Sequence, residues 1–269
     1  MYTIGTLVPS EFSATVAGRH EGIVNLLLSD HAGPYLVSLL RDSRHWTELG
    51  VLLGADQWHR LSTLTAGAVV MRDPDGKIQL PHSRTVLSSF HRHRSVPRRG
   101  ADLPRPDRAT LKRCRTALLE RYSDIGFVSL LARGKAPNDG DAFVRRARTR
   151  LAAAPDAGPK SLSAIIGLGP GMTPAGDDFI SGVLLAQSII HRAGLSERDG
   201  KTVLGALNRT TPAGASLLRL ATADLPPAYQ CAIVEALAVG DCDAAVDRAR
   251  EHGASSGLDA LSGLLWAMI

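Results

Sequence analysis

The hydrophobic pattern of the chain changes once, near residue 107, and this change limits the fold more than any other feature. Before it, short apolar runs such as 23–28, 35–40 and 51–53 are separated by turn residues, which is typical of strands. After it, apolar residues recur at helical spacing, first in 110–122. We therefore predict an α+β fold, with an N-terminal antiparallel β sheet or partial barrel followed by a C-terminal all-α helical domain.

Turn chemistry supports both halves of this prediction. Residues 68–71 and 77–80 flank Asp73-Pro74-Asp75-Gly76. Since Pro presets a turn's φ and Gly accepts the positive φ that follows, we expect a hairpin there. Helices separated by short loops with Gly or Pro are expected over 110–122, 142–153, 174–193, 197–208, 214–223, 227–239, 242–251 and 257–268.

We divide the chain into a β-rich domain (1–90), a basic Pro-rich linker (91–108) and a helical domain (109–269). The formal net charge is +5, and much of the excess lies in 91–108, which also contains three prolines. Contact with a phosphate backbone is one interpretation of this stretch. We favour a solvated connection and expect no nucleic-acid partner, because basic Pro-rich runs commonly serve as linkers.

Cysteine usage and hydropathy indicate the compartment. Cys114, Cys231 and Cys242 are widely spaced and form no Cys-x-x-Cys pair, which suggests buried thiols in a reducing environment. Residues 1–12 lack the pattern of a secretory signal. The longest apolar stretch, 179–190, is shorter than the roughly 20 residues that a membrane span needs. We expect a cytoplasmic protein with no membrane partner.

A glycine-rich segment precedes the helix predicted at 174. We call residues 167–173 the glycine loop; its Gly167, Gly169 and Gly171 lack a Cβ, so a ligand could approach the backbone closely. Thr173 is expected to cap the helix with Pro174 at its first position, as Thr211 and Pro212 would in a second Thr-Pro-Ala-Gly copy. The amides at such a helix start favour a phosphate or carboxylate. We predict that the loop glycines and Thr173 bind substrate.

Two adjacent acidic residues, Asp177 and Asp178, follow this loop. Carboxylates beside a bound anion repel it unless a cation intervenes, so one hypothesis is that they hold Mg²⁺. A second is that they hydrogen-bond an amide or ammonium group of the substrate. A third, purely structural interpretation is that they complement the helix dipole. We predict a catalytic role for both.

A second segment, 253–259, resembles the first in its residue types. Ser255, Ser256 and Asp259 precede or begin the last predicted helix. Ser256 and Asp259 would also fit a capping box, which is the structural alternative. In the functional interpretation the two serines bind the same substrate and Asp259 is a third catalytic carboxylate. Asn25, in the sheet region, is a further candidate for substrate binding.

The run from Gly169 to Phe179, together with 255–259, resembles a bacterial family once described as carboxylases. That family contains the AllH-type subunit of oxamate carbamoyltransferase. The resemblance implies carbamoyl transfer between carbamoyl phosphate and a small amide or amine acid such as oxamate. It also implies that the chain acts with other subunits of a multi-component enzyme.

The motifs of serine hydrolases, zinc enzymes and P-loop NTPases are absent from the sequence. From the glycine loop and the carboxylates and hydroxyls beside it, we expect an enzyme or catalytic subunit acting on a small anionic substrate. One alternative is a stand-alone biosynthetic carboxylase, ligase or cyclase acting on a small carboxylate. Another is a non-catalytic subunit that binds a metabolite. An oligomer is compatible with either.

Overall fold

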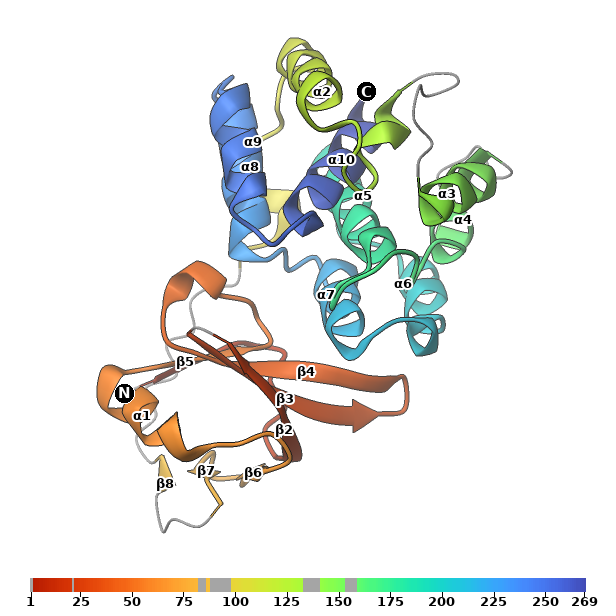
Figure 1. The fold of residues 1–269 in the computed structure, drawn as a ribbon. Coiled ribbons are helices and arrows are strands. Elements are labelled where there is room, and N and C mark those ends of the chain that lie inside the picture. The colour runs from red at the N-terminus through yellow and green to blue at the C-terminus, as the bar shows by residue number, and fades with distance from the viewer. Residues whose placement is uncertain (1, 21, 82–85, 88–97, 133–140, 153–158) are drawn as a thin grey trace. The chain divides into compact units, whose positions relative to one another are not determined.

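The computed structural model describes all residues except 1, 21, 82–85, 88–97, 133–140 and 153–158 (Figure 1). The chain divides into two compact units, residues 1–97 and 98–269. The predicted linker falls partly outside the described residues, since 91–97 are among those left out. Its remainder, 98–108, lies in the second unit, where Gly100–Asp102 forms a 3-10 helix and Leu103 is fully buried.

The first unit is a curled mixed sheet (Figure 1). Its described strands are β1 (Tyr2–Ile4), β2 (Phe12–His20), β3 (Ile23–Asp30), β4 (Gly33–Leu40), β5 (Gly50–Leu53), β6 (Val69–Arg72), β7 (Ile78–Gln79) and β8 (Val86–Leu87), in the order β1-β5-β4-β3-β2-β6-β7-β8. A short helix, α1 (Ala55–Arg60), follows β5. A register shift between Val16 and Gly18 of β2 marks a bulge, and bulges increase strand twist and bending.

Alternation along the strands builds the buried face of this sheet. In the β3–β4 pair, Val24 lies opposite Leu39 and Leu26 lies opposite Val37, and all four are fully buried. The predicted hairpin is confirmed, because β6 and β7 pair antiparallel around a turn in which Gly76 has φ +84°. The predicted antiparallel pairing holds along most of the sheet, with one exception: β4 and β5 run parallel. Residues 41–49 carry the chain back before β5 begins, so the two strands share a direction.

The second unit is helical. It contains α2 (Arg108–Tyr122), α3 (Ala142–Ala152), α4 (Pro159–Ser163), α5 (Ala175–His191), α6 (Glu197–Leu204), α7 (Pro212–Thr222), α8 (Ala228–Ala238), α9 (Cys242–Arg250) and α10 (Ser256–Met268). The α+β fold and the helical second part are thus confirmed. In the described residues, no helix combines the length and apolar character that crossing a membrane requires.

Helix α5 is the central element of this unit, since most of its residues are buried and it packs against α10 and α7 (Figure 1). Two glycines let α5 and α10 approach closely. A Cβ on Gly182 of α5 would overlap the carbonyl oxygen of Ala260, and one on Gly263 of α10 would overlap that of Phe179. The two helices therefore touch backbone to backbone, and this contact brings their first turns together.

Candidate functional site

The glycine loop folds back onto the first turn of α5. Gly167, Gly169 and Gly171 all have positive φ, which explains why glycine occupies these positions. The amide of Gly176 donates to the Leu168 carbonyl at 2.8 Å, and a Cβ on Gly169 would lie 2.9 Å from the Ala175 nitrogen. The inner side of the loop therefore packs against the first turn of α5.

Part of the loop keeps its amides free. Within the described residues, no protein acceptor takes the amide hydrogens of Gly169 or Gly171. Gly171 and Met172 are exposed, and Met172 is 53% exposed despite its apolar side chain. The Gly167 amide is engaged, because it donates to Asp177. The outer loop, 169–173, is therefore the part that presents donors to solvent.

Thr173 joins the two helix starts instead of capping α5. Its Oγ1 lies 2.9 Å from Oγ of Ser256, at the start of α10. The cap residue of α5 is Pro174, so the prediction of Thr173 as N-cap was wrong. In the second copy the prediction is confirmed, since Thr211 Oγ1 accepts from the Gly214 amide at 3.0 Å and Pro212 opens α7. The first copy differs because a tertiary partner takes the Thr173 hydroxyl.

Asp177 is held through both carboxylate oxygens. Oδ1 accepts from the Gly167 amide at 2.9 Å, and Oδ2 accepts from the hydroxyl of Thr210. Burial raises the pKa of Asp177 to about 6, while the Thr210 and Gly167 hydrogen bonds oppose that rise. A Cβ on Gly214 would overlap the same carboxylate. Asp177 therefore fastens the glycine loop and the residues before α7 to α5.

Asp178 and Asp259, which we call the acidic pair, are held differently. Their residues are 1% and 0% exposed. Oδ1 of Asp259 accepts from the Phe127 amide at 2.5 Å. In the described residues, Oδ2 of Asp178 and Oδ2 of Asp259 are buried without a hydrogen-bond partner. Since buried polar atoms are nearly always paired, these two oxygens mark the pair as unusual.

The pKa values of Asp178 and Asp259 are both raised. Burial raises the pKa of Asp178 well above its ordinary range, and the neighbouring Asp259 raises it further by repulsion. The hydroxyls of Ser256 and Thr173 act on Asp178 in the opposite direction. Burial raises the pKa of Asp259 to about 7, against hydrogen bonds from Phe127 and Ser255. Strongly perturbed carboxyls of this kind are frequent in functional sites.

The capping-box interpretation of Asp259 is wrong. The cap residue of α10 is Ser255, which makes no side-chain cap hydrogen bond, and helix α10 begins at Ser256. The Asp259 amide donates to the Ser255 carbonyl at 2.8 Å, while its carboxylate turns toward Phe127. The structure thus brings together the glycine loop, Asp178, Asp259 and both serines.

Asn25 lies in the first unit, on β3. Its Oδ1 accepts from the Ser38 hydroxyl across the β3–β4 pair at 2.8 Å, and the residue is 7% exposed. Its contribution to a substrate site stays a prediction.

Sequence reasoning missed Tyr229, on α8. Burial raises the pKa of the Tyr229 phenol, and the neighbouring carboxylates of Asp178 and Asp259 raise it further. Its hydroxyl accepts from Gln230 Nε2 at 3.0 Å, and the same amide donates to Ser181 Oγ at 2.7 Å. The ring stacks on His252 with centroids 3.6 Å apart. No local motif identifies Tyr229, because α8 reads as an ordinary apolar helix.

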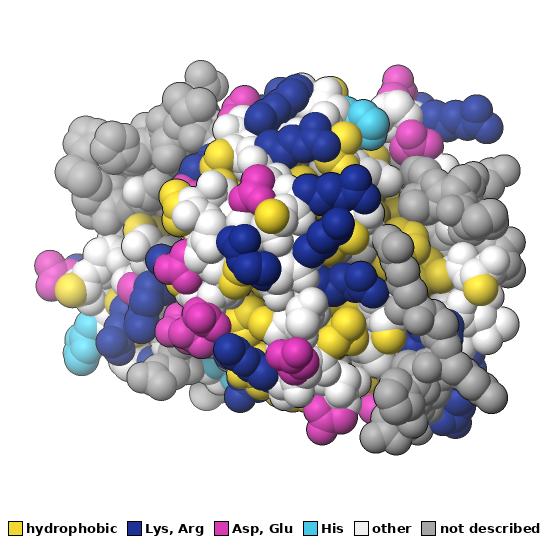
Figure 2. Space-filling model, turned by 90° about the horizontal axis from the view of Figure 1, so that it is seen from above, with side chains coloured by type: hydrophobic (Ala, Val, Ile, Leu, Met, Phe, Trp, Pro, Cys, Tyr) yellow, Lys and Arg dark blue, Asp and Glu magenta, His cyan; other side chains and the backbone are white. Residues whose placement is uncertain are grey.

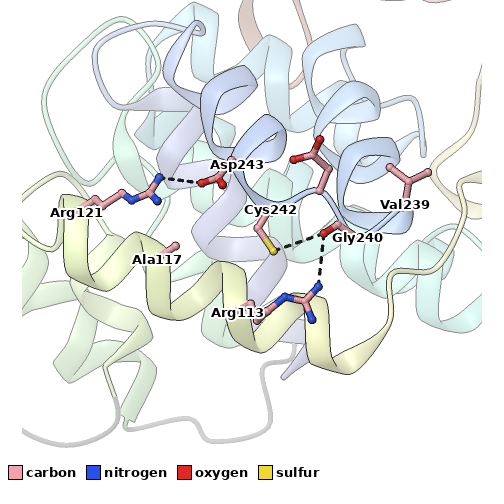
Figure 3. Close-up of a pocket in the computed structure, with 8 residues that line it drawn as sticks. Arg113, Ala117, Arg121, Val239, Gly240, Cys242 and Asp243 are labelled. Atoms are coloured by element: carbon pink, nitrogen blue, oxygen red, sulfur yellow. Dashed lines mark hydrogen bonds and ion pairs between the residues drawn. The ribbon is translucent and has the colours of Figure 1, made fainter.

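A shallow groove lies elsewhere, between α2 and the start of α9 (Figure 3). Arg121 pairs with Asp243 at 3.0 Å, and Arg113 donates to Thr110 Oγ1 at 2.9 Å. Its basic side chains are thus already engaged.

Figure 2 shows Lys and Arg gathered on one face with acidic side chains among them, so the positive charge is not confined to one stretch. The acidic pair remains the better candidate site.

The described residues contain no group of three or more His, Cys, Asp or Glu arranged to hold a metal ion.

Comparison with known proteins gives one family match. Residues 165–268 match the family model described as "Oxamate carbamoyltransferase subunit AllH", and this range contains the glycine loop, both members of the acidic pair and both serines. The match supports an AllH-type family, as the sequence motifs indicated. No curated protein and no solved structure matches the chain.

Proposed function

We propose, from the match of residues 165–268 to the AllH-type family, that this chain is a subunit of a carbamoyltransferase acting on a small anionic substrate. Its site would be the joined starts of α5 and α10. The observation that carries the proposal is the acidic pair, whose two unpaired buried oxygens lie within the matched segment. The word "subunit" in the family description favours a multi-component enzyme, so partner subunits are part of the proposal.

The anionic end of the substrate would bind at the outer loop, 169–173. Free amides of Gly169 and Gly171 suit a phosphate or carboxylate. The α5 and α10 starts contribute positive potential from their helix dipoles. One of the hydroxyls of Thr173 and Ser256 donates to the other, and both also hydrogen-bond Asp178, so they would hold the loop in place beside the ligand. Donors fixed in this way can also stabilise charge as a carbamoyl carbonyl is attacked.

The acidic pair would handle the proton. When an amide or amine nitrogen attacks the carbamoyl carbon of carbamoyl phosphate, a C–N bond forms and the C–O bond to phosphate breaks. The phosphate leaves with the electron pair, and the nitrogen must lose a proton. Since burial raises the pKa of Asp259 to about 7, its carboxylate is a base matched to neutral pH.

Mg²⁺ remains a proposal for the same place. Oδ2 of Asp178 and Oδ2 of Asp259 are hard oxygen donors, which suit this ion. Because only two carboxylates gather there, an ion would take its other ligands from water, hydroxyls or the substrate phosphate.

The test is carbamoyl transfer from carbamoyl phosphate to oxamate, measured for the chain alone and for the complex that co-purifies with it. We expect transfer in the complex, and a loss of about 100-fold or more in Asp259→Asn. Asp243→Asn, on the surface of α9, is the matched control and should keep full activity. Absence of transfer by the wild-type complex would overturn the proposal. Phosphate binding without turnover would then favour a metabolite-binding subunit. Turnover of another carboxylate would favour a carboxylase, ligase or cyclase.

A further inference from the structure

The acidic pair has a hydrogen-bonding deficit that the fold does not require. Asp177, beside it, uses both oxygens within the protein. Asp178 and Asp259 each keep one buried oxygen without a partner in the described part of the chain. A buried acceptor without a partner is unfavourable, so two in one cluster indicate a group that is supplied from outside.

The neighbouring groups limit what that group can be. Thr173 and Ser256 pair with one another at 2.9 Å, and the Gln230 amide is shared between Tyr229 and Ser181. Once the pair is ionised, what remains unsatisfied on its two unpaired oxygens is acceptor capacity. When no cation occupies the pair, a ligand group must bring hydrogen-bond donors, and a planar –NH2 group carries two, one for each unpaired oxygen.

We infer that Asp178 and Asp259 together recognise the –NH2 group of the substrate. The inference rests on the proposed function, since the opposite, anionic end would bind at loop 169–173. It adds a reason why the site would select an amide over a second carboxylate. The –NH2 group of an amide can donate to both unpaired oxygens, whereas a carboxylate has no donor and is repelled by the ionised pair. Oxamate and oxalate differ in this way, since oxalate has a second carboxylate where oxamate has an amide.

The position of the pair fits this role. Asp178 lies in the first turn of α5 and Asp259 in the first turn of α10, one turn inside the Thr173–Ser256 contact. Loop residues 170–172, on the outer side, are exposed. An elongated ligand with donors at its inner end and an anion at its outer end matches this order of acceptors and amides.

The experiment is calorimetric titration of the full chain with oxamate, oxalate and inorganic phosphate. Wild-type protein should bind oxamate about tenfold or more tightly than oxalate. In Asp178→Asn and in Asp259→Asn this ratio should fall below about threefold, while phosphate binding is not weakened. Asp243→Asn should keep the wild-type ratio. Circular dichroism identifies any variant that fails to fold. If both variants fail to fold, the oxamate-to-oxalate affinity ratio of the wild-type protein tests the inference by itself.

Equal wild-type affinities for oxamate and oxalate would overturn the inference, as would a preference that survives both substitutions. If the co-purified complex still transfers carbamoyl groups in that case, the proposed function stands and only this assignment fails. If the chain binds none of the three probes and the complex is inactive, both fail.

Discussion

Thr173 Oγ1 and Ser256 Oγ lie 2.9 Å apart, although 83 residues separate them in the chain. This hydrogen bond fastens the start of α5 to the start of α10. Asp178 and Asp259, in the first turns of the same helices, are consequently close enough for the charge of Asp259 to raise the pKa of Asp178. One hydroxyl contact thus holds the frame in which the acidic pair sits.

The two hydroxyls should be energetically coupled. Thr173→Val and Ser256→Ala should each lower the free energy of unfolding by about 0.5–1.5 kcal/mol. Together they should cost less than the sum, with a coupling of about 0.5–1 kcal/mol, because either change already removes the bond. Urea unfolding of the four proteins gives the cycle. Thr173→Ser, which keeps the hydroxyl, should retain most of the coupling; strictly additive effects would contradict a shared hydrogen bond.

Two helical glycines should respond oppositely to alanine. A Cβ on Gly214 would overlap the Asp177 carboxylate, whereas one on Gly200 of α6 would meet nothing within 4 Å. Gly214→Ala should therefore destabilise the protein by about 1–3 kcal/mol. Gly200→Ala should stabilise it by up to about 1 kcal/mol, because alanine favours helix. Thermal unfolding measures both, and a neutral Gly214→Ala would mean that Asp177 can move away freely.

Stability should fall as the pH rises toward neutrality. Burial raises the pKa of Asp177 to about 6 and that of Asp259 to about 7, whereas an unfolded aspartate titrates near about 4. The folded state thus holds these protons more tightly, so their stabilising contribution is complete below about pH 4 and is lost as pH passes through about 6 to 7.

The Asp259→Asn variant isolates one part of this effect. Its melting temperature should drop less than that of the wild type between pH 5 and pH 8, because the variant has no carboxyl to ionise there. Thermal unfolding at one-unit steps tests this, with Asp243→Asn expected to follow the wild-type curve. Parallel curves for Asp259→Asn and wild type would show that Asp259 ionises normally.

Asp177 should behave as a positioning residue. Asp177→Asn replaces one acceptor with a donor facing either the Gly167 amide or the Thr210 hydroxyl. We expect a loss of about 1–3 kcal/mol in unfolding free energy. The affinity for oxamate should fall, because the glycine loop is no longer fixed by Asp177. The preference for oxamate over oxalate should remain. A lost preference at full stability would instead place Asp177 in contact with substrate.

Local patterns predicted local structure well. The Asp73–Gly76 turn and the helices of the second unit depend on turn chemistry and on apolar spacing, which neighbouring residues determine. The direction of β5 depends on the path of residues 41–49, so no pattern within β4 or β5 could show that the two are parallel.

The candidate site was predictable in its residues and not in its contacts. Glycines, hydroxyls and aspartates at two helix starts are visible in the sequence, but capping rules assigned Thr173 and Ser256 to their own helices. The structure pairs them with each other. The amide of Phe127 and the ring of Tyr229 joined the cluster without any sequence signal, because a backbone donor and a lone aromatic residue become part of a site only through packing.

Gly182 and Gly263 have a significance beyond their own close contact. Each sits further along its helix than the carboxylates, yet each sets how near the opposite backbone can come. A larger residue at either position would push the backbones of α5 and α10 apart and so separate the starts of the two helices. The gap between Asp178 and Asp259, and with it their mutual repulsion, could thus be tuned by evolution or by design without altering a single polar group.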